Sequence, residues 1–107
     1  MSASYSPLAE RDLEHIQDEV FEACRDAETT QRYMDAMMDK IEAKTIYPRS
    51  GTLLYWFDRF TGYYYVVYKA YIAFYYIADN GICIERILHG KSDYMNKLVP
   101  RMPADGE

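Results

Sequence analysis

The stretch Ile82–Tyr94, ICIERILHGKSDY, determines how the rest of the chain is organised. Its first half is short, apolar and rich in β-branched residues, which favours a β-strand that stops at His89-Gly90. Asp79-Asn80-Gly81 comes before it and is a strong signal for a tight hairpin turn. The preceding run, Tyr71–Ile77, also has the length and composition of a strand. We therefore predict two antiparallel strands that display His89, Gly90 and the polar residues after them at one end of a sheet.

Two helices are predicted in the N-terminal half. Ser6-Pro7 is a favourable helix start, and apolar residues then recur at helical spacing as far as Cys24. Asp26 can cap a second helix that ends near Lys44. Because only a few residues connect the two helices, they should form an antiparallel hairpin. The predicted core consists of Leu13, Ile16, Val20, Met34, Met37, Met38 and Ile41 against Phe74, Ile82, Ile84 and Leu88.

The remaining segments complete an α+β pattern. Ala3–Tyr5 is long enough for a short first strand, Thr52–Phe57 fits either a strand or an apolar loop, and Tyr63–Tyr68 has strand composition. The predicted fold is an antiparallel sheet of three to four strands with the helical hairpin packed on one face. We assign residues 1–99 to a single domain and residues 100–107, which contain proline and glycine, to a flexible C-terminal tail.

Composition limits the classes of function. No apolar run reaches the roughly 20 residues of a membrane span, and the N-terminus lacks a signal-peptide pattern, so a cytoplasmic protein without a membrane partner is predicted. Cys24 and Cys83 are isolated, and we expect neither a metal site nor a cofactor. The formal net charge is −5, and residues 1–48 hold five Lys/Arg against eleven Asp/Glu. Residues 49–107 hold seven against six, so a basic stripe on that half could still contact phosphates.

Individual residues leave several roles open. His89 stands where a strand stops, and it can act as a general acid or base or simply bind backbone carbonyls. His15 is expected on the surface of the first helix. Arg86 lies among apolar residues and should pair with an acid, with Asp93 and Glu85 as candidates, unless it serves catalysis or binding. No nucleotide-binding loop, hydrolase elbow or metalloprotease motif is present in the sequence.

The tyrosine-rich strands suggest a binding surface. The chain has twelve tyrosines, and the strands that carry many of them lie beside Arg59, Lys69 and Lys91 in the sequence. Aromatic rings next to cations can stack on the bases of a nucleic acid. The same residues would equally suit a peptide that lies along the sheet.

Three segments carry a resemblance to a known family. They are Tyr5–Leu13 (YSPLAERDL), Tyr71–Tyr75 (YIAFY) and Arg86–Tyr94 (RILHGKSDY). In this order, over about residues 3–98, they resemble the RelE/ParE superfamily, the toxins of bacterial type II toxin–antitoxin modules. The resemblance implies a small toxin that stops growth and is neutralised by a cognate antitoxin wrapped around it. It also implies a helical hairpin on a sheet.

Members of the superfamily that the chain resembles act by one of two mechanisms. RelE-like members cut mRNA in the ribosome, which requires a proton acceptor, a proton donor and cations, and they usually carry an arginine where this chain has Ile72. ParE-like members poison DNA gyrase and share the pattern Arg-Ile-Leu-His-Gly. The missing arginine and the acidic net charge favour the ParE-like mechanism. The RelE-like ribonuclease and a degenerate, non-toxic protein-binding member are the alternatives, so whether the chain is an enzyme stays open.

The predicted site residues fall into three groups. Residues that would carry toxicity, or catalysis if RNA is cut, are His89, Lys91 and Tyr94, which should be displayed together at one end of the sheet. Residues expected to contact the target, either gyrase or the ribosome with its mRNA, are Arg59, Lys69 and Arg86. Residues expected to form an exposed aromatic surface for the antitoxin are Tyr63, Tyr64 and Tyr68.

Overall fold

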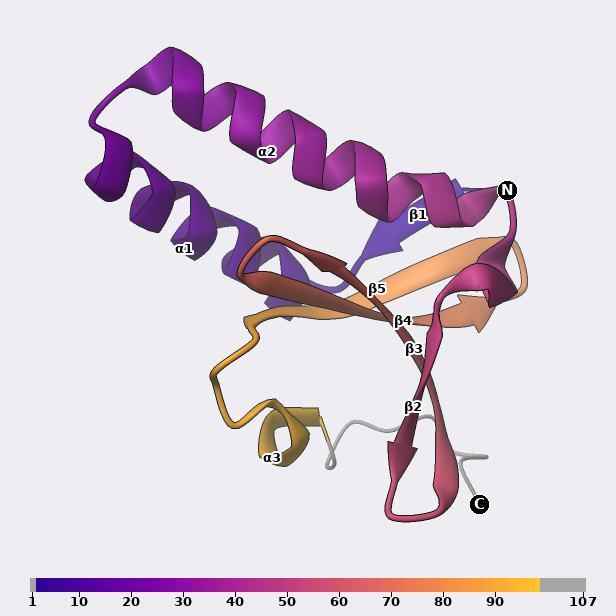
Figure 1. The fold of residues 1–107 in the computed structure, drawn as a ribbon. Coiled ribbons are helices and arrows are strands. Elements are labelled where there is room, and N and C mark those ends of the chain that lie inside the picture. The colour runs from indigo at the N-terminus through magenta and orange to yellow at the C-terminus, as the bar shows by residue number, and fades with distance from the viewer. Residues whose placement is uncertain (1, 99–107) are drawn as a thin grey trace.

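The computed structural model describes residues 2–98, which form one sheet flanked by helices (Figure 1). In chain order the elements are β1 (Ser2–Tyr5), α1 (Pro7–Cys24), α2 (Ala27–Glu42), the short 3-10 helices η1 (Ala43–Thr45) and η2 (Pro48–Ser50), β2 (Thr52–Trp56), β3 (Arg59–Tyr68), β4 (Tyr71–Ala78), β5 (Gly81–His89) and α3 (Tyr94–Leu98). The predicted tail at 100–107 lies outside the described residues. No helix in the described range is long and apolar enough to cross a membrane.

The predicted helical hairpin is confirmed, and local capping explains its ends. The Ser6 hydroxyl oxygen accepts the Ala9 N–H at 3.0 Å and donates to the carbonyl of Glu85 at 2.6 Å, so it starts α1 and ties it to β5. Arg25 ends α1 in the left-handed conformation, with φ of 56°. The Asp26 carboxylate then accepts the Thr29 N–H at 2.8 Å and starts α2. The tight connection turns the second helix back along the first (Figure 1).

The sheet has five strands in the order β1-β5-β4-β3-β2, so the prediction of three to four antiparallel strands is wrong in part. Strands β2 to β5 are antiparallel neighbours, but β1 runs parallel to β5, with Ser2 opposite Gly81 and Tyr5 opposite Ile84. A four-residue strand carries too little pattern to reveal its partner or direction from the sequence. The undecided segment after Gly51 forms the edge strand β2.

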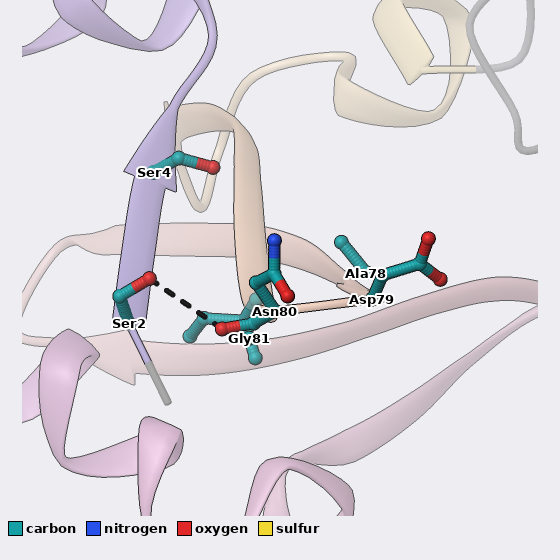
Figure 2. A pocket seen from close by; sticks show the side chains of 7 residues that line it. Ser2, Ser4, Ala78, Asp79, Asn80 and Gly81 are labelled. Carbon is teal, nitrogen blue, oxygen red and sulfur yellow. Dashed lines mark hydrogen bonds between the residues drawn. The ribbon is translucent and has the colours of Figure 1, made fainter.

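The β4–β5 turn packs tightly against β1, as Figure 2 shows. The Ser2 backbone N–H donates to the carbonyl of Asn80 at 3.2 Å. Gly81 has φ of 152°, and a Cβ on it would lie 1.9 Å from the Ser2 carbonyl oxygen. Only glycine therefore fits at this point, where the hairpin turn and the first strand meet.

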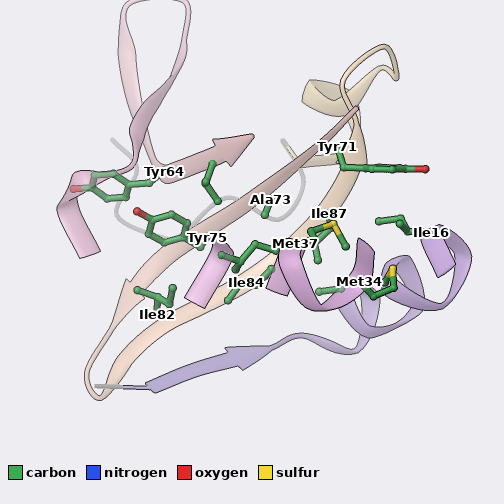
Figure 3. Close-up of a cluster of buried hydrophobic side chains, with 13 residues drawn as sticks. Ile16, Met34, Met37, Tyr64, Tyr71, Ala73, Tyr75, Ile82, Ile84 and Ile87 are labelled. Carbon is green, nitrogen blue, oxygen red and sulfur yellow. The ribbon is translucent and has the colours of Figure 1, made fainter. Parts of the chain in front are cut away.

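Both faces of the sheet are covered, and each has its own apolar cluster. The face under α1 and α2 includes Ile16, Met34 and Met37 against Ala73 and Ile87 (Figure 3). The opposite face carries α3 (Figure 1), and its cluster consists of Leu54, Tyr63, Phe74, Leu88 and Leu98.

The core prediction is therefore wrong for Phe74 and Leu88, which do not face the helical hairpin. Neighbouring residues of a strand point to opposite faces, and Ala73 already occupies the helix side. In β5 the pairing register shifts where Tyr75 lies opposite Ile84 but Phe74 lies opposite Arg86. This irregularity changes the alternation of β5, which the sequence pattern alone does not reveal.

Candidate functional site

The end of β5 is held in a compact turn that fixes His89. The carbonyl of His89 accepts the Ser92 N–H at 2.9 Å and the Ser92 hydroxyl at 2.6 Å. The Lys91 N–H donates to His89 Nδ1 at 3.1 Å, so the neutral imidazole carries its proton on Nε2. Gly90 N–H donates to the Ala70 carbonyl at 2.8 Å, which places the β3–β4 turn beside this loop.

The His89 ring lies on the helix side of the sheet. It meets the ring of Tyr71, its partner across the β4–β5 ladder, edge-on at 5.5 Å between centroids. The Tyr71 hydroxyl donates to Glu19 Oε1 of α1 at 2.6 Å. Burial, together with this carboxylate, raises the pKa of Tyr71, so its hydroxyl stays protonated as a donor. His89 is thus supported by a side chain that is itself fixed to α1.

Arg86 is held in an ion pair with α1. Asp12 accepts from Arg86 Nε at 2.8 Å and from Nη2 at 3.0 Å, and it also accepts the Ile87 N–H at 2.9 Å. Its hydrogen bonds to the Asp12 carboxylate raise the pKa of Arg86. The expectation of an acidic partner is confirmed, but the partner in this bidentate pair is Asp12 and not Asp93 or Glu85.

Asp12 is the site residue that the sequence pattern did not single out. Beyond Tyr5, β1 no longer covers the edge of β5, and Asp12 takes its place by accepting the Ile87 N–H. A signal was present, because Asp12 stands three residues after Ala9 and four before Ile16, on the apolar stripe of α1. A carboxylate on a buried stripe requires a partner.

Tyr94 does not lie with His89. It begins α3 and packs its ring on Phe74, 5.2 Å between centroids, on the face opposite the helical hairpin. Lys91 is exposed in the loop next to His89. The structure therefore brings His89 and Lys91 together, while the expectation that Tyr94 joins them in one small area is wrong. The polypeptide crosses from one face to the other between residues 89 and 94, which strand spacing could not predict.

The three cations expected to contact a target do not form one patch. Arg59 begins β3, and Lys69 follows its last residue, so the length of a ten-residue strand, roughly 30 Å, separates them. Lys69 places its Nζ 5.4 Å from the centroid of the Tyr68 ring. It adjoins Ala70, whose carbonyl binds Gly90, so Lys69 belongs to the His89 end of the sheet. Arg86 is engaged by Asp12.

The predicted aromatic surface is wrong for Tyr63 and Tyr64, whose exposed fractions are 0% and 4%. Tyr64 stacks on Tyr75 at 5.6 Å and accepts a hydrogen bond from Arg49 Nη1 at 3.1 Å. Tyr68 is half-buried and meets Tyr33 edge-on. Strand β3 has neighbours on both edges and packing on both faces, so its tyrosines serve the interior.

Most of the large exposed hydrophobic side chains lie instead on β2 and on the segments next to it in the chain. We call this the β2 patch. Its residues, with exposed fractions between 40% and 86%, are Ile46, Tyr47, Leu53, Tyr55 and Phe57. Leu54 is the one buried residue of β2, while Leu53 and Tyr55 on either side of it are exposed and Phe57 follows the end of the strand.

The site contains no recognisable metal centre. Within residues 2–98, no group of three His, Cys, Asp or Glu side chains is arranged to hold a metal ion. The groups that the structure offers here are an imidazole, an exposed ammonium and hydrogen-bonded carboxylates. They are suited to binding and orientation through charge and shape.

Comparison with known proteins gives the family. The family model described as the ParE toxin of the type II toxin–antitoxin system, parDE, matches residues 3–94. No curated protein matches the chain. The match spans β1 through the start of α3 and includes both halves of the Asp12–Arg86 pair. The chain belongs to the ParE toxin family of type II toxin–antitoxin systems.

Proposed function

We propose that this toxin stops bacterial growth by poisoning DNA gyrase and that a cognate antitoxin neutralises it. The proposed target places its action in the cytoplasm. The end of β5, where Lys91 is exposed beside His89, is the proposed contact with gyrase, and Lys69 on the adjoining turn adds a second positive charge. Such a contact works through charge and shape and needs no proton transfer.

The observation that carries the proposal is the separation of His89 from Tyr94. Cleavage of RNA by its own 2′-hydroxyl needs a proton acceptor and a proton donor around one phosphate. Here the imidazole packs against Tyr71 on the helix side, while the phenol packs on Phe74 on the opposite face. Ile72, where RelE-like nucleases usually have an arginine, is a partly buried member of that second cluster. These positions disfavour the ribonuclease mechanism.

The charge of the protein supports the same choice. Binding within the ribosome places a protein among RNA phosphates, and such proteins gain affinity from many Lys and Arg contacts. This chain has a formal net charge of −5. Exposed carboxylates such as Glu10, Glu14 and Asp18 cover α1, so a long RNA surface would be repelled there.

The β2 patch is the proposed contact for the antitoxin. Large exposed aromatic side chains are the usual anchors of protein interfaces, and Phe57 and Tyr47 are 86% and 74% exposed. Phe57→Ser should therefore weaken antitoxin binding by tenfold or more, on the order of 1–2 kcal/mol. A matched control is Phe21→Ser on α1, which is also exposed but lies outside the patch. Equal affinity of both variants for the antitoxin would contradict this assignment.

Expression without antitoxin, followed by two readouts, tests the mechanism. DNA damage with gyrase bound to linearised plasmid is the expected result. Loss of translation in an extract with mRNA cut at codons would replace the proposal with the RelE-like ribonuclease. Normal growth with soluble toxin present would identify a non-toxic member that only binds a partner.

A further inference from the structure

A cleft of about 220 Å³ lies between α1, the end of β5 and α3. Both histidines of the chain, His15 and His89, line it, together with Lys97 of α3. All three of these side chains belong to exposed residues, and they come from three different elements. The cleft therefore gathers two titratable imidazoles and an ammonium around one small volume.

The two carboxylates that line the cleft already accept hydrogen bonds from the protein. Asp12 is paired with Arg86 and accepts a backbone N–H as well. Glu19 accepts the hydroxyl of the buried Tyr71 at 2.6 Å. Both oxygens of Asp12 and Oε1 of Glu19 accept from the protein's own donors, so the N–H donors for a ligand come from His15, His89 and Lys97.

We propose that this cleft, which the Asp12–Arg86 pair also lines, binds a phosphate group, either free or on a phosphorylated small molecule, through His15, His89 and Lys97. The orientation of His89 suits this role, because its Nδ1 accepts the Lys91 N–H and its Nε2 is left as the donor. Ser92 lines the same cleft, but its hydroxyl already donates to the carbonyl of His89, so it serves to hold the loop in place. The inference goes beyond the proposed action on gyrase and does not depend on it.

Size and surrounding charge favour a small ligand over a nucleic acid. A volume of about 220 Å³ is below the range of roughly 300–1,000 Å³ typical for drug-sized ligands. Exposed acids on α1, among them Glu14, Asp18 and Glu22, lie on the helix that forms one wall. They would repel a polyanion that extended out of the cleft along α1, whereas a single phosphate can contact His15, His89 and Lys97 without reaching them.

Nuclear magnetic resonance of the two imidazoles tests the proposal directly. Inorganic phosphate is added to the full chain at constant pH, with chloride used to hold ionic strength constant. The signals of His15 and His89 should shift together along one saturating curve. Lys97→Ala and His15→Gln should each weaken the apparent affinity about tenfold, the scale of losing one charged hydrogen bond.

Lys40→Ala is the matched control, because Lys40 is an exposed lysine in the last turn of α2 and does not line the cleft. It should bind phosphate as the unchanged protein does. Shifts that do not saturate, or that are the same in Lys97→Ala, would overturn the proposal. Glycerol phosphate that binds at least as tightly as free phosphate would support a phosphorylated ligand. Succinate that binds as tightly as phosphate, or a short DNA that binds more than tenfold tighter, would overturn the assignment to a small phosphate.

Discussion

Removing the Asp12 carboxylate should lower the free energy of unfolding, because this side chain joins α1 to β5. In Asp12→Ala, the Arg86 guanidinium and the Ile87 N–H lose their shared acceptor at a place where the two ion-paired side chains are only 10% and 16% exposed. Breaking a buried pair on one side costs about 3–5 kcal/mol, because an uncompensated charge remains. Typical domains have about 5–15 kcal/mol of stability in total, so this one change consumes a large share.

Chemical denaturation followed by circular dichroism measures the loss, with two companion variants. Glu22→Ala removes an ion pair to Arg25 of similar length, 3.1 Å, but with side chains 67% and 70% exposed, and it should cost less than about 1 kcal/mol. Asp12→Ala combined with Arg86→Met leaves no unpaired charge and should be more stable than Asp12→Ala alone. An Asp12→Ala loss below about 1 kcal/mol, or a double variant no more stable than the single one, would refute the reasoning.

Two further predictions concern the core and the tyrosines. Ile16 and Leu88 lie on opposite faces of the sheet, with side chains 3% and 6% exposed. Replacing either by alanine should cost about 2–5 kcal/mol in the same denaturation experiment, and losses below about half a kcal/mol would contradict the packing. Burial and Glu19 raise the pKa of Tyr71, and the hydrogen bond with Cys83 and burial raise the pKa of Tyr76 to about 12. Since the folded state favours the protonated phenols, their stabilisation is complete below the unfolded pKa of about 10 and is lost as pH rises towards the folded values. Absorbance near 295 nm should therefore show that these phenolates form at a higher pH in the folded protein than in denaturant. Titration of all tyrosines near pH 10 in the folded protein would count against this prediction.

Local patterns predicted much of this fold. The helix starts at Ser6 and Asp26, the turn at Gly81 and the strand that ends at His89 follow from capping chemistry, turn residues and apolar spacing, and the structure confirms each of them. What failed depends on long-range arrangement. The parallel pairing of β1 with β5 and the second apolar face under α3 are set by how distant segments meet.

The candidate site shows the same division. The position of His89 at the end of a strand was predictable, but its support by Tyr71 and Glu19 joins residues far apart in the chain. The burial of Tyr63 and Tyr64 depends on helices and strands that cover both faces of β3, whereas tyrosine by itself fits an interior or an interface. The pairing of Asp12 with Arg86 could not be predicted, because the two residues are 74 positions apart in the chain. The position of Asp12 on an apolar helix stripe nevertheless indicated that its carboxylate needs a partner.

The most direct test of the proposed mechanism is a cleavage assay with purified gyrase, supercoiled plasmid, ATP and the toxin. We predict that the toxin makes linear, gyrase-bound DNA accumulate, that Lys91→Glu abolishes this effect, and that Tyr94→Phe, which keeps the ring on Phe74, leaves it nearly unchanged. Circular dichroism of each variant confirms that it is folded. No linear DNA from a folded toxin, together with mRNA cleavage that Tyr94→Phe lowers by roughly 10²-fold, would contradict the account and establish proton transfer as the basis of toxicity.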